Sequence, residues 1–373
     1  CPRRLGYRRG CGPCSRHRTR TPTTPRRSVL QSRRWTVLVL AFLWIPLVFI
    51  VALSVAENAS TLFDVTADDV TLEDVTLNAS DNTAVNLDLV DGDSVTISDT
   101  TLDVTTGTAI NADETDASID ATIEENTFEA DSDDEARYVS DDNDVLDLAA
   151  IQADNTFGNV VLVEGNSDFA LTPTIQGGVD VADSTTGADT VSVGAGTYDE
   201  SVTVDVEGLT LEGPNAGLAG DSDQRGAEAL VNRTSTPGSG GSAVSITAAG
   251  VTVDGFQIES AAQNGISVDQ PVSNITIQNN RVTSVAGNTF GSNSGDRATG
   301  NGIAFGLPRS ASETTVTGLE VSNNVITGVT TEDLAASEDR TTANGIQVLT
   351  RQHTVEDMEI TGNVITELEA GTS

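Results

Sequence analysis

The chain has 373 residues, 37% hydrophobic and 20% charged, which is enough for two ordinary domains with apolar cores. Its charge is divided unevenly: residues 1–34 carry eleven arginines and no acid, whereas residues 57–373 carry eight arginines against 56 acidic residues, a formal charge of −48. The absence of lysine excludes a Walker phosphate loop, a Schiff-base lysine and a lysine-built surface for nucleic acid. All three cysteines precede residue 35, so residues 57–373 contain no disulfide and no cysteine metal site.

The basic segment 1–34 contains the tetrapeptide Cys11-Gly12-Pro13-Cys14, which has the spacing of a redox-active cysteine pair. Such a pair needs a strand followed by a helix N-terminus to activate a thiol, and this Arg-, Pro- and Thr-rich run has no strand pattern. We therefore interpret the motif as coincidental. Because the only methionine is Met358, we expect translation to begin near Val29 or Leu30 on another start codon, with residues 1–28 untranslated.

Residues 35–56 form an apolar run that follows Arg33 and Arg34 directly. A charged segment, an apolar core and the small residues 54–56 are the three parts of a signal peptide. The run is also long enough to span about 30 Å of hydrocarbon, so an uncleaved membrane anchor is the alternative. Both interpretations place residues 57 onward outside the cell, because the arginines hold the N-terminus inside. Residues 32–34 also match half of a twin-arginine signal.

The acidic composition of residues 57–373 predicts a protein that folds in concentrated salt. A surface this negative repels itself in dilute buffer, whereas in molar salt the Debye length falls to about 3 Å and screens the repulsion. This composition resembles that of proteins from extreme halophiles, haloarchaea in particular, and it argues against binding to nucleic acid. High charge with few aromatic residues is also typical of disorder, but a strand-like alternation of apolar and polar residues argues against disorder.

Residues 57–166 repeat a short unit with a period near 25. The sequence VTLEDVTL at 70–77 returns as VTISDTTL at 95–102 and as ATIEENTF at 121–128, and residues 154–157 read DNTF. The threonines at the equivalent position are Thr76, Thr101, Thr127 and Thr156. One coil of such short strands cannot bury its own apolar residues, but stacked coils can, at about 4.8 Å per step. The period therefore predicts stacked coils of a solenoid, and the resemblance described below implies that residues 57–166 are a first β-helix segment.

A second repeat extends to the end of the chain. A nine-residue unit occurs at 275–283, 319–327 and 358–366, and it alternates with Asn-Gly-Ile at 264–266, 301–303 and 344–346. Asparagine tolerates left-handed backbone angles at corners and pairs with asparagine in the next coil, so Asn280, Asn324 and Asn363 predict a hydrogen-bonded ladder. A β-sandwich is the alternative, but hairpins seldom repeat one nine-residue unit at equivalent places.

Residues 175–214 carry a more specific pattern: ADTV at 188–191, GTYDE at 196–200 and LTLEGP at 209–214. These motifs resemble the opening of a right-handed parallel β-helix of the pectin-lyase-like superfamily, in which a short amphipathic cap precedes the first coil. The predicted fold class is therefore all-β, a right-handed parallel β-helix solenoid preceded by a signal peptide or signal-anchor helix.

The resemblance also divides the body of the chain. A cap that starts near Leu171 makes residues 167–373 a second parallel β-helix, with residues 166–172 as a linker. Gly177 and Gly178 are poor helix residues and predict a frayed or irregular cap. Because the sequence stops just after a strand unit, we expect this second β-helix to be truncated at its C-terminus.

The resemblance implies that an active site would lie on the outer face of one sheet, in a cleft walled by long turns. The long turns here are 216–241, 286–300 and 330–343, and the Asn-Gly-Ile strands between the last two carry Ser267, Ala304 and Gln347 at outward positions. None of these three is a carboxylate, an arginine or a histidine.

Four residues are the catalytic candidates if the chain is an enzyme. Glu320 and Glu359 occupy equivalent outward positions, which predicts carboxylates about 5 Å apart, as in a retaining glycosidase. A calcium-binding pair and a solvated acidic ladder are the alternatives. Arg351 and His353, at the end of the third Asn-Gly-Ile strand, have the chemistry of an acid, a base or an anion clamp, and an isolated surface histidine is the ordinary alternative.

The metal candidates are Asp141, Asp142 and Asp144, whose oxygens suit Ca²⁺ although the run lacks the spacing of a known calcium loop. No other cofactor is expected. Four Asn-x-Ser/Thr sequons, at Asn58, Asn78, Asn232 and Asn274, are about as many as chance predicts for this composition.

The leading functional hypothesis is an extracytoplasmic β-helix surface protein of a halophile that acts as a structural, adhesive or binding scaffold. Its partners would be the cell envelope or an extracellular polysaccharide, and the membrane through residues 35–56 if that segment is uncleaved. The alternative is a polysaccharide lyase or glycoside hydrolase, although the Gly-His-Gly, Gln-Asp-Thr and Asp-Phe-Ile-Phe-Gly motifs of the related enzymes are absent. A copper-delivery protein shares such repeats, but one methionine and one histidine after residue 56 are too few soft-metal ligands.

Overall fold

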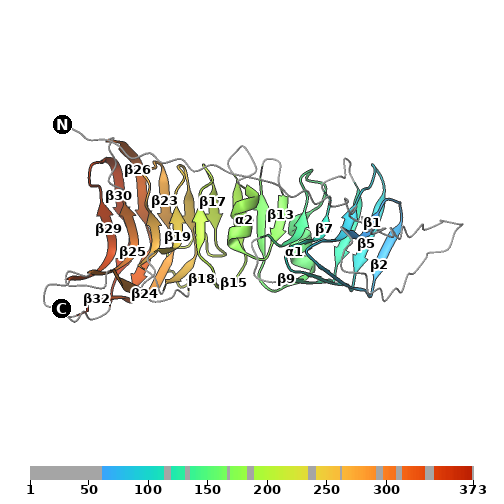
Figure 1. Cartoon of the computed structure of the whole chain (residues 1–373), viewed down its shortest axis with the longest axis horizontal. Helices are drawn as coiled ribbons and strands as arrows, with labels where there is room; N and C mark the ends of the chain where they lie inside the picture. The colour runs from blue at the N-terminus through green and yellow to red at the C-terminus, as the bar shows by residue number, and fades with distance from the viewer. Residues whose placement is uncertain are drawn as a thin grey trace, which may run out of the picture. The chain divides into compact units, whose positions relative to one another are not determined.

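The computed structural model of the chain describes residues 61–112, 119–130, 135–165, 169–182, 189–233, 241–260, 263–290, 297–307, 313–331 and 340–371. These residues form an all-β structure with long parallel sheets and two short helices (Figure 1). The apolar run 35–56, predicted to be a signal peptide or anchor, lies outside the described residues. Within those residues, no helix has the length and apolar character needed to cross a membrane.

The first series of strands precedes residue 158. Its strands are β1 Thr61–Val65, β2 Val70–Glu73, β3 Thr76–Ser80, β4 Thr83–Leu87, β5 Ser94–Ser98, β6 Thr101–Val104, β7 Thr108–Asn111, β8 Asp120–Glu124, β9 Thr127–Ala130, β10 Arg137–Ser140 and β11 Thr156–Phe157. Each strand pairs in parallel with its equivalent one repeat later, which gives the orders β1-β4-β7-β10, β2-β5-β8 and β3-β6-β9-β11. Three strands therefore make one coil, as a solenoid-like fold requires.

The register of the first series confirms the period near 25. Thr76 pairs with Thr101, Thr101 with Thr127, and Thr127 with Thr156, so the predicted threonines form one column. The residue after each of the first three threonines points inward, and Leu77, Leu102 and Phe128 are at most 2% exposed. In the last coil the helix α1, Leu148–Asp154, takes the place of a strand beside β8 and buries Leu148 and Ile151.

Two antiparallel strands, β12 Val161–Glu164 and β13 Phe169–Thr172, join the first series to the second. Residues 169–172, expected to belong to a linker, therefore form a strand. β13 pairs antiparallel with β10 and with β12, and β12 pairs antiparallel with the first strand of the second series. The strands of the second series consequently run opposite to those of the first within one continuous 12-stranded sheet, which we call the long sheet.

The β12–β13 pair is buried on both faces. Leu162 and Leu171 pack into the apolar core of the first series, whereas Val161, Val163 and Ala170 pack into the core of the second. The two cores thus lie on opposite sides of the long sheet. Reversing the strand direction and changing the side of the core together leave the winding sense of the coils unchanged.

The helix α2, Ile175–Ala182, covers the start of the second core and packs against β12 and β13. Glu200 accepts hydrogen bonds from the backbone N–H groups of Ile175 and Gln176 at 2.8 and 2.9 Å, which satisfies two of the free donors at the helix N-terminus. Contrary to the expectation of an irregular cap, the glycines lie within the helix. Gly178 permits close packing there, since a Cβ at this position would lie 2.8 Å from Cγ1 of Val161.

The second series begins at residue 189. Its strands are β14 Thr190–Val193, β15 Gly196–Tyr198, β16 Val202–Val204, β17 Thr210–Glu212, β18 Ala229–Arg233, β19 Ser242–Ile246, β20 Thr252–Asp254, β21 Gln257–Ser260, β22 Asn264–Val268, β23 Ile275–Gln278, β24 Arg281–Phe290, β25 Arg297–Gly306, β26 Thr315–Ser322, β27 Val325–Thr327, β28 Val329–Thr331, β29 Arg340–Leu349, β30 Thr354–Thr361, β31 Val364–Ile365 and β32 Leu368–Glu369. The long sheet continues as β14-β17-β20-β23-β26-β30. The orders β16-β19-β22-β25-β29 and β15-β18-β21-β24-β27-β31 form the other two faces of the coils.

The register of the second series confirms the nine-residue unit. Ile277 pairs with Val321, and Val321 pairs with Ile360, so the three residues form one column in the long sheet. Ile277 and Val321 are fully buried, whereas Ile360 is 47% exposed because β30 is the last strand of the long sheet. Burial of each such side chain contributes roughly 1.5–3 kcal/mol, which is why the coils must stack.

Left-handed residues turn the chain directly before the segment that all long-sheet strands of the second series share; in the longer strands β26 and β30 these residues lie within the strand. The residue before each inward apolar position has a positive φ in five successive coils, and three of the five are glycines. These residues are Gly208 (φ 82), Gly250 (φ 76), Asn274 (φ 60), Gly318 (φ 66) and Asp357 (φ 53). Asparagine and aspartate are the other residue types that adopt this conformation most readily.

The predicted asparagine ladder is present at the opposite corner. Asn280 donates through Nδ2 to Oδ1 of Asn324 at 3.1 Å, and Asn324 donates to Oδ1 of Asn363 at 3.0 Å. The preceding residues, Asn279 and Asn323, have φ values of 57° and 56°. In each Asn-Asn pair, the first asparagine therefore turns the chain, and the side chain of the second forms a hydrogen bond to the next coil.

Candidate functional site

The two candidate glutamates lie on adjacent strands of the long sheet. Glu320 on β26 and Glu359 on β30 are register partners, which confirms their predicted adjacency and places their Cα atoms about one strand spacing, ~4.8 Å, apart. Ser322 donates its hydroxyl to Oε1 of Glu320 at 2.9 Å. Glu320 is half-buried and Glu359 is exposed, so the pair can contact a ligand on the outer face of the sheet.

Arg351 and His353 occupy a different place. They belong to the turn between β29 and β30, in which the N–H of His353 donates to the carbonyl of Thr350 at 2.9 Å. Along β30, Thr354 and Glu359 are five residues apart, at most about 16 Å at the usual rise of a strand, and the left-handed Asp357 lies between them. The structure therefore brings the two glutamates together but places Arg351 and His353 near the other end of the strand.

The side chain of His353 is not on the surface. The residue is only 6% exposed, whereas Arg351 is exposed and has a φ of 51°. The expectation of an isolated surface histidine is thus wrong, because the turn folds the imidazole against the coil. The catalytic role of the four residues stays a prediction.

On the face that carries the Asn-Gly-Ile strands, two of the three positions expected to be outward are buried, and the third, Gln347, is half-buried. Ser267 on β22 is fully buried and Ala304 on β25 is 4% exposed. Ser267 donates to Oδ2 of Asp269 at 2.8 Å and accepts from the hydroxyl of Ser242 at 2.7 Å. The expected turn 286–300 contains the ends of β24 and β25, which pair antiparallel. These contacts leave no open cleft at Ser267.

The metal candidate Asp141 has a structural role. Its carboxylate is fully buried and accepts hydrogen bonds from the backbone N–H groups of Val145 and Leu146, at 2.7 Å for the shortest. The carboxylate therefore closes the turn that leads from β10 toward α1. Asp142 and Asp144 are exposed. Across the described part of the chain, no group of three or more His, Cys, Asp or Glu side chains is arranged to hold a metal ion.

A buried ionic cluster that the sequence did not reveal fixes the turn after β17. Arg225 has a side chain only 1% exposed, and it forms a salt bridge with Glu228 at 2.7 Å. It also donates to the carbonyl of Asn279 at 2.6 Å, and Arg281 donates to the carbonyl of Gly220 at 2.6 Å. The first half of the expected long turn 216–241 therefore lies on the corners of later coils instead of standing out as a cleft wall.

Asp254 is a buried carboxylate with a structural role that the sequence did not reveal. It is 6% exposed, and it accepts from Nδ2 of Asn279 at 2.8 Å, from Nε2 of Gln278 at 2.9 Å and from the N–H of Gly217 at 3.2 Å. The one available signal was its position before Gly255, a left-handed residue at the end of β20. With three donors around it, Asp254 positions the turn and is not set up to react.

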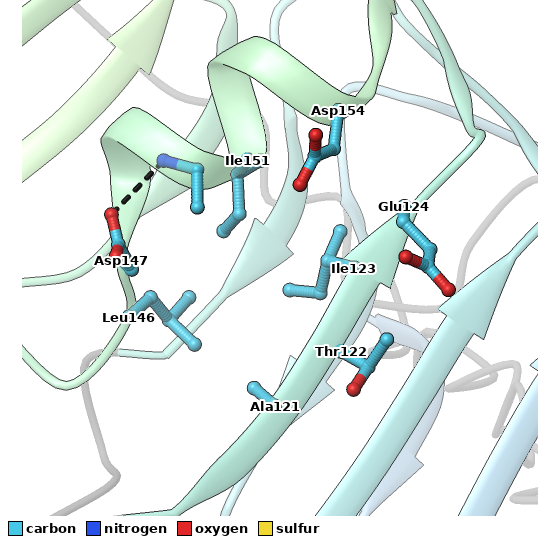
Figure 2. Close-up of a pocket in the computed structure, with 9 residues that line it drawn as sticks. Ala121, Thr122, Ile123, Glu124, Leu146, Asp147, Ile151 and Asp154 are labelled. Carbon is cyan, nitrogen blue, oxygen red and sulfur yellow. Dashed lines mark hydrogen bonds between the residues drawn. The ribbon is translucent and has the colours of Figure 1, made fainter.

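A small pocket of about 170 Å³ lies between β8 and α1 (Figure 2). Its floor is apolar, formed by Ala121, Ile123, Leu146 and Ile151, and the acidic residues at its rim are Glu124, Asp147 and Asp154. Asp147 accepts a hydrogen bond from the N–H of Ala150, so it serves as the N-cap of α1. The pocket arises because a helix replaces a strand at this step of the stack.

Two tyrosines have a raised pKa, and burial explains the shift in both. Burial raises the pKa of Tyr138 to about 12, and the ring packs against Phe128 and Phe157 at centroid distances of 5.8 and 5.1 Å. Burial also raises the pKa of Tyr198, whose hydroxyl lies 3.1 Å from the carbonyl oxygen of Val160. Both tyrosines are neutral at ordinary pH and neither is placed to transfer a proton to solvent.

Comparison with known proteins adds no assignment: no family model, no curated protein and no solved structure matches the chain.

Proposed function

We propose that the chain is an extracytoplasmic right-handed parallel β-helix of the pectin-lyase-like kind, which serves as a structural, adhesive or binding scaffold on the surface of a halophile. The observation that carries the proposal is the long sheet, which continues through both series of coils. The right-handed sense agrees with the strong preference of parallel strand crossovers for that hand. The motif residue Glu200, which caps α2, has a structural role that fits this fold.

The side chains of the candidate site support a scaffold over an enzyme. Asp141, Asp254 and Glu228 all hold backbone or arginine donors that fix turns. The two outward glutamates lie far along β30 from Arg351 and His353. Acid–base groups must lie within hydrogen-bond reach of one substrate, and this arrangement does not bring Arg351 and His353 to the glutamate pair.

The salt requirement tests the halophilic part of the proposal. The full chain is expected to show cooperative unfolding by circular dichroism in molar NaCl, and to lose its strand signal in dilute buffer. The reason is that screening to about 3 Å removes the repulsion among its carboxylates. A chain equally stable in dilute buffer and in molar salt would contradict the halophilic origin.

A carbohydrate-active enzyme is the second candidate, and the adjacency of Glu320 and Glu359 favours it. The two proposals separate in one assay. The full chain is incubated in molar salt with acidic and neutral polysaccharides, and reducing ends and unsaturated products are measured. The scaffold proposal expects no product with the wild type. Turnover that Glu320→Gln and Glu359→Gln both abolish, while Glu212→Gln retains it, would establish the enzyme instead.

A further inference from the structure

Three of the four sequons lie within the described residues, and the structure distinguishes them. Asn78 is exposed, but its Nδ2 donates to Oδ2 of Asp103 in the next coil at 2.6 Å. Asn232 is half-buried on β18, and its Nδ2 donates to Oδ1 of Asp199 at 2.7 Å. An N-linked glycan attaches through this same nitrogen, so at both positions the amide is already held by a carboxylate.

Asn274 stands in a different environment. It is exposed, it has a φ of 60°, and it is the corner residue directly before β23. Its backbone is fixed, because its N–H donates to the carbonyl of Thr317 in the next coil at 2.9 Å. The side chain therefore lies on the surface at a fixed corner, where modified asparagines are expected.

The glycines of the neighbouring coils leave room for this amide. In the column of left-handed residues, Asn274 lies between Gly250 and Gly318, neither of which has a side chain. A Cβ at Gly318 would lie only 2.7 Å from Oδ1 of Asn274. The amide thus occupies space that the side chain of any residue other than glycine at position 318 would fill. Thr276, which completes the sequon, lies on the outer face of the long sheet and is half-buried.

We propose that Asn274 is an N-glycosylation site; this rests on the extracytoplasmic location proposed above. The donor is a glycan linked through its anomeric carbon to a polyprenyl phosphate or pyrophosphate, and a membrane-bound transferase supplies the catalysis. Nδ2 of Asn274 forms a bond to the anomeric carbon while the bond from that carbon to the phosphate oxygen breaks. The amide nitrogen gives up one proton and the lipid-linked phosphate departs, so the transfer needs no oxidant or reductant.

The test uses the full chain, expressed in cells that export and N-glycosylate their own surface proteins in molar salt. Peptide mass spectrometry is expected to show the mass of a glycan on the peptide that contains Asn274, at higher occupancy than on the peptides with Asn78 or Asn232. Thr276→Ser is expected to keep the modification and Thr276→Ala to remove it. Equal circular dichroism spectra for the two variants exclude misfolding as the cause of the loss.

Protease accessibility on intact cells separates this inference from the proposed function. An exported chain whose Asn274 peptide is unmodified overturns the glycan site and leaves the location standing. An exported chain modified at Asn78 or Asn232 in preference to Asn274 overturns the argument from the glycine-flanked corner. A chain that stays inside the cell overturns both proposals together.

Discussion

The asparagine ladder makes a quantitative prediction at its central member. Asn324 is fully buried, and its Oδ1 accepts from the backbone N–H of Asn280 at 2.9 Å while its Nδ2 donates to the carbonyl of Ile277 at 2.8 Å. The substitution Asn324→Ala leaves both backbone groups without these partners inside the stack. Each buried group so orphaned costs about 1–3 kcal/mol, so the free energy of unfolding is expected to fall by roughly 2–6 kcal/mol.

Asn363 provides a matched control in the same ladder. It makes the equivalent bonds to the N–H of Asn324 and to the carbonyl of Val321, at 3.0 and 2.7 Å, but it is only half-buried. Water can replace the lost bonds there, so Asn363→Ala is expected to cost about 1 kcal/mol.

Urea unfolding of the three proteins in molar salt, followed by circular dichroism, measures both losses. The slopes of the transitions should agree, since the surface exposed on unfolding is nearly unchanged. Equal losses for Asn324→Ala and Asn363→Ala, or a loss below about 0.5 kcal/mol at Asn324, would refute the reasoning that burial makes the ladder stabilising.

Three further perturbations test other parts of the structure. Gly255→Ala is expected to lower the urea midpoint by more than Gly92→Ala, because a Cβ at Gly255 would lie 2.2 Å from the backbone nitrogen of Ala216 at a φ of 83°. At Gly92 φ is 89° and no atom lies within 4 Å, so only the left-handed strain of about 1–2 kcal/mol applies there. Equal midpoints for these two variants would count against backbone crowding at that corner. Arg225→Met should cost about 1–3 kcal/mol, because the carbonyl of Asn279 loses its donor and Glu228 keeps only its bonds to Arg281 and Asn215. Arg351→Met on the surface should stay within about 0.5 kcal/mol of the wild type, and a neutral Arg225→Met would show that the cluster is dispensable. Because burial raises the pKa of Tyr138 to about 12, above its ordinary value of 10, the unfolded state loses the proton first; stability is complete below pH 10 and falls as the pH rises toward 12, and Tyr138→Phe should flatten this alkaline decline relative to the wild type in pH-dependent unfolding.

The periodic parts of the structure were predictable, since one repeat dictates the register of all the others. The column of Thr76, Thr101 and Thr127 and the pairing of Glu320 with Glu359 follow from spacing alone. Such predictions work because a slip of one residue would turn every inward side chain toward water.

The joint between the two series was not predictable from a repeat. A strand buried on both faces reads as a continuous apolar run, and residues 160–163 are Val-Val-Leu-Val. That run carried the signal, but the antiparallel pairing with β13 depends on contacts that no period describes. The burial of Arg225, Asp141 and His353 was not predictable from the repeat either, because each of these residues lies in an irregular turn.

The β12–β13 pair has a consequence for how the protein comes apart. The pair separates two apolar cores and contributes to both: Leu162 and Leu171 pack into one core, whereas Val161 and Val163 pack into the other. If either series of coils unfolded, one apolar face of the β12–β13 pair would become exposed to water. The pair would then be less stable, and the core of the remaining series would lose part of its cover. Coils in such arrays are stabilised by their neighbours, so the β12–β13 pair couples the unfolding of the two series.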